Sequence, residues 1–231
     1  VPNITPDPET GIGRFKDEEL ARMIRYGVKP DGHAALPFMP YADLCDDDLT
    51  AIISYLRVQK PVKHEVPEHD INALGRVVQA FVLEPKGPSH PSRKSFEPAA
   101  TAEYGDYLTH NVGNCVMCHT KIDMRTGNFD GPAFGGGAIH EAVNNPKKQF
   151  VTPNLTPDPR WGWLQGWSED AFVARFHAGR VQSDSPMPWE SFKGMTDTDL
   201  RAIYRYFQTL PPAQTGPDPR EHQVVLTAQN P

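Results

Sequence analysis

The five residues Cys115-Val116-Met117-Cys118-His119 decide most of what this sequence predicts. Cys-x-x-Cys-His is the attachment signature of a c-type haem: the two thiols add to the haem vinyl groups, and the imidazole becomes an axial iron ligand. Two intervening residues on a helical turn set the sulfurs at about the separation of the vinyl groups, and the next residue then points under the ring. The motif therefore predicts one covalently attached haem c.

Paired cysteines also have other uses. Structural zinc normally takes four ligands from two such clusters, and the one further cysteine of this chain, Cys45, stands alone. A thioredoxin-like redox pair belongs to a βαβ pattern, whereas residues 103–108 ahead of the motif are typical of a helix start. Haem is the favoured interpretation, with zinc or dithiol chemistry as the alternatives, and Cys45 is interpreted as a packed thiol.

The composition predicts small, loop-rich domains. The chain has 231 residues, of which 24 are proline and 38% are hydrophobic, and a haem offers a large apolar surface around which such domains can close. The net charge of −6 argues against nucleic acid as a partner and is compatible with docking to a basic surface. The most apolar stretch, residues 73–83, contains Arg76 and is too short to cross a bilayer.

Covalent haem attachment takes place outside the cytoplasm, so the motif predicts an exported protein, with the periplasm as its expected location. The sequence starts at Val1 without the basic and apolar segments of a signal peptide. We interpret it as a mature or shortened product.

An internal repeat relates the two halves of the chain. Each copy contains an Asn-[Ile/Leu]-Thr-Pro-Asp-Pro stretch, an aromatic residue before an acidic helix start, a Met-Pro-aromatic loop and an amphipathic helix. Each first helix is expected to end at a glycine, Gly27 or Gly179. The matching stretches are 3–8 with 154–159, 15–20 with 167–172, 37–41 with 185–189, and 48–56 with 199–207.

The second copy is preceded by a segment, residues 100–150, that contains the haem motif, and the first copy has no equivalent. We favour a longer two-haem protein whose first attachment motif lies upstream of Val1. A one-haem protein with a vestigial first lobe is the alternative.

On the basis of these motifs, the chain resembles a family of two-domain, dihaem-type bacterial c-type cytochromes. Members of this family are the cytochrome c subunits of membrane-associated alcohol, sugar and aldehyde dehydrogenases. The resemblance implies a mainly α fold with few or no strands, in which two class I-like cytochrome c domains are joined by a proline-rich connector. We expect residues 1–60 to be the C-terminal part of the first domain and 61–100 the connector. Residues 101–212 are then the complete haem domain and 213–231 a tail.

The resemblance also implies the site residues. Cys115 and Cys118 are the thioether anchors, His119 is the proximal ligand and Met187 the distal ligand. Met39 would be the distal ligand of a second, upstream haem, whose histidine is not in this sequence.

The residues around Met187 support the same ligand independently. A thioether favours reduced iron and raises the potential, as electron transfer requires, and Pro186 and Pro188 stiffen the loop. Among the rivals, Met117 lies inside the motif, Met124 is too close in sequence, and Met195 is expected to open the last helix. A histidine ligand or an open iron position stays as the alternative to Met187.

The remaining polar motifs receive structural interpretations. His110, His140 and His177 are expected to be structural or solvated, and the spacing of the histidines at 33, 64 and 69 supports no haem site. The run 135–137 of three glycines lacks the Lys-Ser/Thr ending of a phosphate loop, so we expect it to pass close to a flat cofactor. The tryptophans at 161, 163, 167 and 189 are expected near the haem edge. Arg175 and Arg180 are candidates for balancing propionate charge, with an ordinary surface role as the default.

These features predict an electron carrier and not an enzyme: single electrons pass from a dehydrogenase partner to a downstream acceptor. The sequence has no nucleophile with a base, no paired carboxylates and no hydride-cofactor fingerprint. The alternative is a haem enzyme, peroxidase-like or thiosulfate-oxidising, that uses an open iron position.

Overall fold

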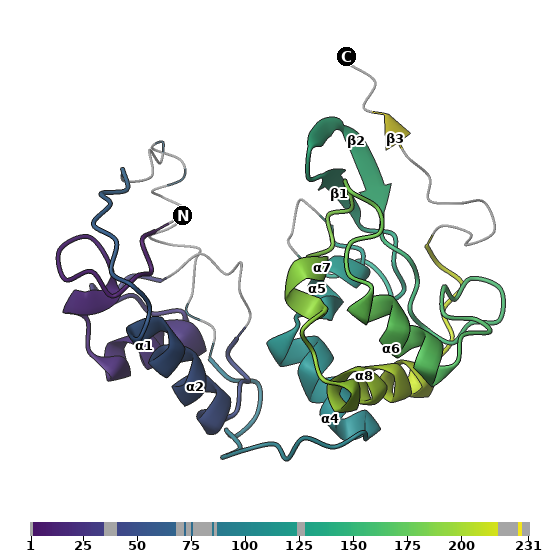
Figure 1. Cartoon of the computed structure of the whole chain (residues 1–231), viewed down its shortest axis with the longest axis horizontal. Helices are drawn as coiled ribbons and strands as arrows, with labels where there is room; N and C mark the ends of the chain where they lie inside the picture. Colours follow the sequence, from purple (N-terminus) through teal and green to yellow (C-terminus); the bar gives the residue numbers. More distant parts are fainter. Residues whose placement is uncertain are drawn as a thin grey trace. The chain divides into compact units, whose positions relative to one another are not determined.

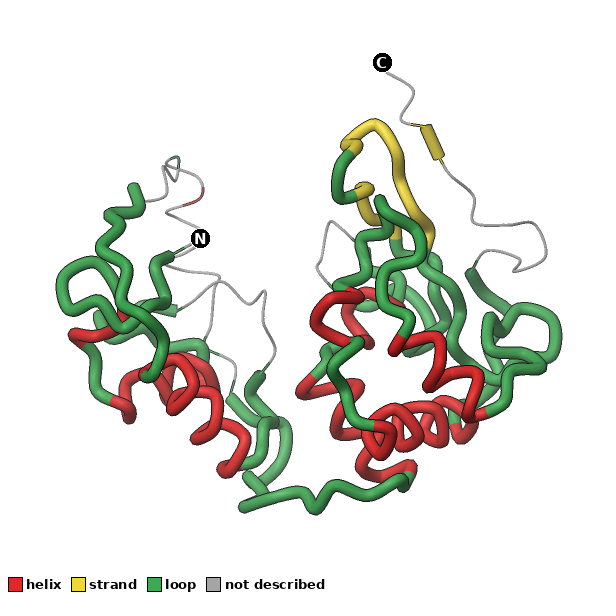
Figure 2. The backbone as a smooth tube through the Cα atoms, viewed as in Figure 1, coloured by secondary structure: helices red, strands yellow, loops and turns green. Residues whose placement is uncertain are grey.

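The computed structural model describes residues 2–34, 41–67, 72, 75, 85, 87–123, 128–216 and 226–227. The chain divides into two compact units, Val1–Phe96 and Glu97–Pro231, and Figure 1 colours them from purple to blue and from teal to yellow. Helices make up most of the regular structure of the described residues (Figure 2), which confirms the mainly α class. Met39, Met124 and most of the apolar stretch 73–83 lie outside the described residues.

The first unit contains the short 3-10 turn η1 (Ile12–Arg14) and the helices α1 (Asp17–Tyr26) and α2 (Asp46–Arg57). Each helix has three acidic residues in its first turn, where negative charge stabilises the N-terminus. α1 ends, as predicted, at Gly27 in the left-handed conformation. The small core of this unit comprises Ile12, Leu20, Leu49 and Ile53.

The second unit is built around α4 (Ala102–Tyr107), which packs across the long helix α8 (Asp197–Thr209). The two backbones come very close at Gly105, where an added Cβ would lie 2.0 Å from the carbonyl oxygen of Ala202. α4 continues into the π-helical turn η2 (Leu108–Val112). Beside this crossing, the fully buried ring of Phe134 packs against the rings of His110, Tyr206 and Phe207.

Replacing Gly105 with alanine should destabilise the second unit. The added methyl group meets main-chain atoms of α8 that cannot move aside, so we expect the free energy of unfolding to fall by roughly 3 kcal/mol, the upper end of overpacking costs. Urea unfolding of the haem-loaded protein measures this change. Gly194→Ala is the control, because a Cβ there would lie 3.7 Å from its nearest neighbour; equal stability of the two variants would contradict the close crossing.

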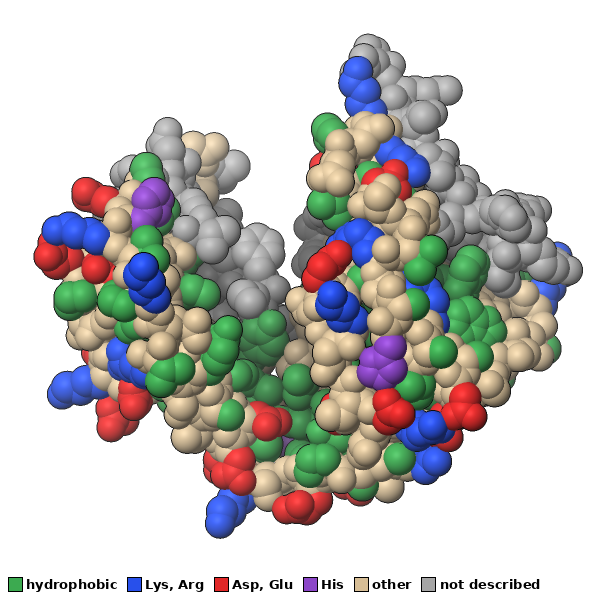
Figure 3. Space-filling view, viewed as in Figure 1, with side chains coloured by type: hydrophobic (Ala, Val, Ile, Leu, Met, Phe, Trp, Pro, Cys, Tyr) green, Lys and Arg blue, Asp and Glu red, His purple; other side chains and the backbone are tan. Residues whose placement is uncertain are grey.

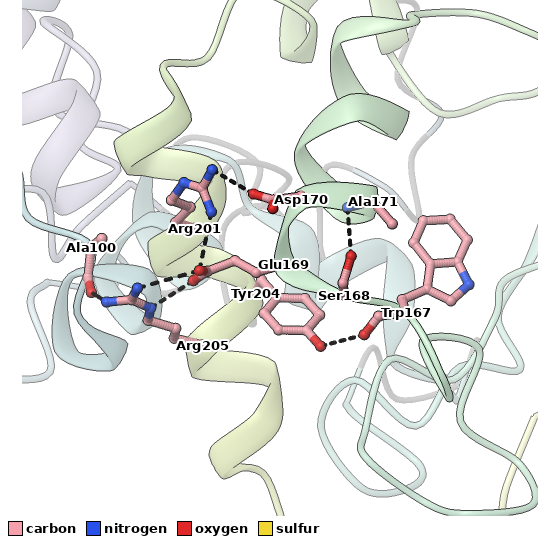
Figure 4. Close-up of polar contacts among 9 residues, drawn as sticks. All are labelled: Ala100, Trp167, Ser168, Glu169, Asp170, Ala171, Arg201, Tyr204 and Arg205. Atoms are coloured by element: carbon pink, nitrogen blue, oxygen red, sulfur yellow. Dashed lines mark hydrogen bonds and ion pairs between the residues drawn. The ribbon is translucent and has the colours of Figure 1, made fainter.

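Helix α6 (Glu169–His177) packs on α8 through a polar network (Figure 4). The carboxylate of Glu169 accepts hydrogen bonds from Arg201 at 3.1 Å and from Arg205 at 2.6 Å. Arg201 also donates to Asp170 at 2.7 Å. The side-chain hydroxyl of Ser168 caps α6 by accepting a hydrogen bond from the main-chain N–H of Ala171.

A small antiparallel sheet, in the order β1-β2-β3, completes the second unit. Its strands are β1 (Ile139–Ala142), β2 (Asn145–Val151) and β3 (Leu226–Thr227). The expectation of few strands is therefore met, although the hairpin of β1 and β2 was not predicted. The helix α5 (Cys115–His119) lies before this hairpin in the chain, and α7 (Trp189–Phe192) lies between α6 and α8.

The two copies of the Asn-x-Thr-Pro-Asp stretch form the same turn, which confirms the repeat in this part. The Asn3 side-chain oxygen accepts hydrogen bonds from the N–H and hydroxyl of Thr5, as Asn154 does from Thr156. The amide nitrogen of Asn3 donates to the chain that follows α2, and that of Asn154 donates to the chain that follows α8. Asn3 reaches the carbonyl of Val62 at 2.8 Å, and Asn154 reaches the carbonyls at residues 213 and 215, at 2.6 and 3.0 Å.

Candidate functional site

The motif Cys115–His119 forms the short helix α5. The chain enters it from η2 through Asn114, which is in the left-handed conformation with φ 51°. Cys115 and Cys118 are three positions apart, so one helical turn brings their thiols to the same side of α5. Both thiols are free, and burial raises the pKa of Cys115 to about 12.

His119 is positioned by a carbonyl from a distant part of the chain. Its side chain is buried, and Nδ1 lies 3.1 Å from the carbonyl oxygen of Pro153. Because a carbonyl can only accept, Nδ1 is the protonated nitrogen, and the lone pair of Nε2 remains for a ligand. Burial, with a smaller contribution from the neighbouring His140, lowers the pKa of His119 to about 4, and the hydrogen bond with Pro153 only partly opposes this shift. The imidazole is therefore neutral at pH 7, the form that binds a metal ion.

The surroundings of α5 fit a covalently attached haem better than zinc. Within the described ranges, no three histidine, cysteine or acidic side chains come together to hold a metal ion, so the two cysteines have no partners for a tetrahedral zinc site. Two buried polar atoms near α5, Asn114 Oδ1 and His140 Nε2, find no hydrogen-bond partner among the described residues. Two thiols on one side of a helical turn, followed by a neutral imidazole, match the donor set of a c-type haem.

Met187 lies in a partly buried loop between Pro186 and Pro188, directly before α7. Helix α7 approaches the motif: a Cβ added to Gly113 would lie 3.3 Å from the sulfur of Cys115 and 3.8 Å from the ring of Phe192. Figure 1 shows the labels of α5 and α7 beside each other in the second unit. The element that follows the Met187 loop is thus a neighbour of the haem motif.

Two of the rival methionines, Met117 and Met195, lie within the described residues. Met117 lies within α5 itself, as the sequence requires. Met195 does not begin α8, contrary to the expectation. The helix begins two residues later, at Asp197, with Thr196 as its N-cap. The Asp199 carboxylate stabilises this start by accepting a hydrogen bond from the main-chain N–H of Thr196.

Of His110, His140 and His177, two have structural partners, as predicted. His177 is exposed on α6 and lies 2.8 Å from a carboxylate oxygen of Asp197. His110 lies 2.8 Å from a carboxylate oxygen of Asp106; burial alone would lower its pKa, but the hydrogen bonds and charge of Asp106 outweigh burial and raise it. His140 differs from both, since its Nε2 is buried without a partner among the described residues.

The glycine run 135–137 passes close to other parts of the protein's own chain, a contact that the sequence did not predict. A Cβ on Gly136 would lie 2.6 Å from main-chain atoms of residues 152–154, and the φ of this glycine is +71°. Its N–H donates to the carbonyl of His119 at 2.8 Å. The glycines therefore let the chain run beside the segment that contains Pro153.

The two arginines considered for propionate charge have protein partners. Arg180 forms an ion pair with Glu190 at 2.6 Å. The guanidinium carbon of Arg175 lies 3.7 Å from the centre of the Trp189 ring. Sequence reasoning named these residues without finding these contacts, and it missed Pro153 as the partner of His119.

Comparison with known proteins identifies relatives of this chain. No family model matches the chain. The cytochrome c subunit of the quinone-dependent alcohol dehydrogenase of Gluconacetobacter polyoxogenes is 33% identical over 91% of this chain and 47% of the relative. The chain is a homologue of dehydrogenase cytochrome c subunits. The chain is also 28% identical to the gluconate 2-dehydrogenase cytochrome c subunit of Pantoea cypripedii, over 90% of the chain and 50% of the relative.

A diheme cytochrome c of Cereibacter sphaeroides is 25% identical over 91% of the chain and 71% of the relative. The resemblance predicted from the motifs is thereby confirmed. The chain spans about half the length of the dehydrogenase subunits that it matches. Of the helices in the described residues, none has the length and apolar character needed to cross a membrane.

Proposed function

We propose that the unit Glu97–Pro231 is a c-type cytochrome domain that transfers single electrons. Cys115 and Cys118 would attach the haem, with His119 as proximal ligand and Met187 as distal ligand. The observation that carries the proposal is the state of His119: it is buried and neutral, and the carbonyl of Pro153 fixes its Nδ1. When bound, the haem supplies a one-electron redox centre.

The chain's own residues would tune that centre. The Pro153 carbonyl fixes the orientation of the His119 ring and increases the basicity of the coordinating nitrogen. The prolines on both sides of Met187 limit the movement of its loop when the iron changes charge. Burial of the His119 ring lowers the dielectric constant around its coordinating nitrogen.

We propose a dehydrogenase subunit as the electron donor, an unidentified protein as the downstream acceptor, and the periplasm as the location. The homologous subunits of alcohol and gluconate dehydrogenases support the donor class. Acidic and basic side chains are intermixed on the face of the molecule drawn in Figure 3. The described residues on that face form no large patch of a single charge, and we expect docking there through contacts of both charges.

The first unit is proposed to belong to a second cytochrome-type domain. The shared turns at Asn3 and Asn154 support this proposal, as does the homologous diheme cytochrome. Met39 would then be the distal ligand of a second haem attached by residues outside this sequence.

The test uses the protein isolated from its natural source. We expect the peptide that contains Cys115 and Cys118 to have the mass of its residues plus one haem, and the reduced protein to leave added carbon monoxide unbound, because Met187 fills the distal position. A peptide without haem would overturn the proposal. Prompt binding of one carbon monoxide per haem would favour the haem-enzyme alternative, and the total haem count per chain decides the role of Met39.

A further inference from the structure

One arginine holds the loop that bears Met187. Arg180 follows Gly179, whose φ of 64° turns the chain away from the end of α6. Its Nη1 donates to the carbonyl of Ser185, and its Nη2 donates to the carbonyl of Met187 at 3.2 Å. These carbonyls lie on the two sides of Pro186, so a single planar group fixes the loop before and after that proline.

The guanidinium of Arg180 is itself held in place by Glu190 on α7. Its Nε and Nη2 each donate to one carboxylate oxygen of Glu190 at 2.6 Å. Only 20% of the Arg180 side chain is exposed, whereas its partner Glu190 is 60% exposed, so the arginine side of the pair is the one shielded from solvent. The two parallel bonds require the fork of an arginine, which a lysine ammonium does not provide.

Trp189 anchors the end of the same loop. Its indole N–H donates to the hydroxyl of Ser185 at 3.3 Å, and the ring of Phe176 meets it edge-on with centroids 5.4 Å apart. Arg175 stacks on the ring. The loop is thus fastened at both ends, and Arg180 makes the contacts on either side of Pro186.

We propose that Arg180 is a positioning residue for Met187: it holds the loop in one conformation so that the thioether is presented as a ligand without rearrangement. This inference rests on the proposed function, in particular on ligation by Met187. A thioether is a weak ligand. A looser loop would therefore leave the distal position open for a larger fraction of the time, and an added ligand would bind more tightly in proportion.

The test compares Arg180→Lys with a matched control in the other unit, Arg57→Lys. Arg57 has the same kind of contacts as Arg180: its guanidinium binds the carboxylate of Asp17 and the carbonyls of Ile12 and Phe15. Both variants keep the positive charge and lose the fork. Only the first is expected to change the Met187 loop.

The readout is titration of the oxidised, haem-loaded protein with imidazole, together with the weak long-wavelength absorption band of methionine-bound ferric haem. We expect Arg180→Lys to bind imidazole roughly tenfold more tightly than the wild-type protein, the effect of losing one hydrogen bond to a charged group. Arg57→Lys should bind it with wild-type affinity.

The outcomes separate this inference from the proposed function. If the wild-type protein has the methionine band and Arg180→Lys binds imidazole with wild-type affinity, the positioning role is wrong while Met187 ligation stands. If the wild-type protein lacks the band, both are wrong. If Arg180→Lys does not fold, Glu190→Gln takes its place, because it removes the partner carboxylate at a position that is 60% exposed. The imidazole affinity of Glu190→Gln, compared with that of the wild-type protein, then tests the positioning role.

Discussion

The double substitution Cys115→Ala and Cys118→Ala is expected to yield a protein without attached haem. Both thioether anchors are lost, so the mass of the exported chain should fall by one haem, and the peptide that spans residues 115–119 should have the mass of its residues alone. The second unit should also lose much of its cooperative unfolding, because the haem would be part of its core. Intact-mass spectrometry and thermal unfolding followed by circular dichroism measure the two effects.

Cys45→Ala is the matched control. Cys45 is 2% exposed and lies in the first unit, at the N-cap of α2. This variant should keep a full complement of haem on residues 115–119. Retention of haem by the double variant, with its mass unchanged relative to the control, would rule out attachment through these two cysteines.

The substitution Met187→Leu is expected to lower the midpoint potential of the haem. Leucine preserves the approximate volume of the side chain but offers no sulfur ligand, and the loss of a thioether removes the preference for reduced iron. Axial ligands move haem potentials over about 0.8 V in all, so we expect a fall of roughly 0.1 V or more. Spectroelectrochemical titration gives the potential, and the methionine absorption band should disappear.

Met195→Leu controls for the loss of a methionine elsewhere in the same unit. Met195 is partly buried between α7 and α8. Its variant should keep both the wild-type potential and the absorption band. An unchanged spectrum in Met187→Leu, or the same change in both variants, would remove Met187 from the ligand set.

The sequence allowed the helices to be predicted because their signals are local. The acidic first turns, the glycine at residue 27 and the apolar spacing along residues 199–207 each act within a few residues, and α1, α2, α6 and α8 form where these signals indicate. The hairpin was missed because β2 has no alternating burial: its first three residues are exposed and only Phe150 is fully buried. A strand without that alternation has no period-2 pattern to recognise.

The contacts of the candidate site were beyond local reasoning. His119 and Pro153 are 34 positions apart, and nothing in either neighbourhood indicates that one bonds to the other. The glycines at 135–137 were recognised as a close-approach signal, but the sequence does not show that the main chain of residues 152–154 lies against Gly136. Sequence patterns thus indicated which residues are special, whereas the identity of their partners depends on how the chain returns on itself.

The turn at Asn154 limits where the second unit can be truncated. Asn154 sits next to Pro153 and spends both donors of its amide on the chain beyond α8, at Ala213 and Thr215. An excised haem domain that stopped at residue 212 would leave that buried amide without partners, at a typical cost of about 1–3 kcal/mol. The lost hydrogen bonds would lie next to the carbonyl of Pro153, which orients His119. The segment that follows α8 therefore stabilises the side of the site on which His119 lies. An excised haem domain should extend at least through Thr215.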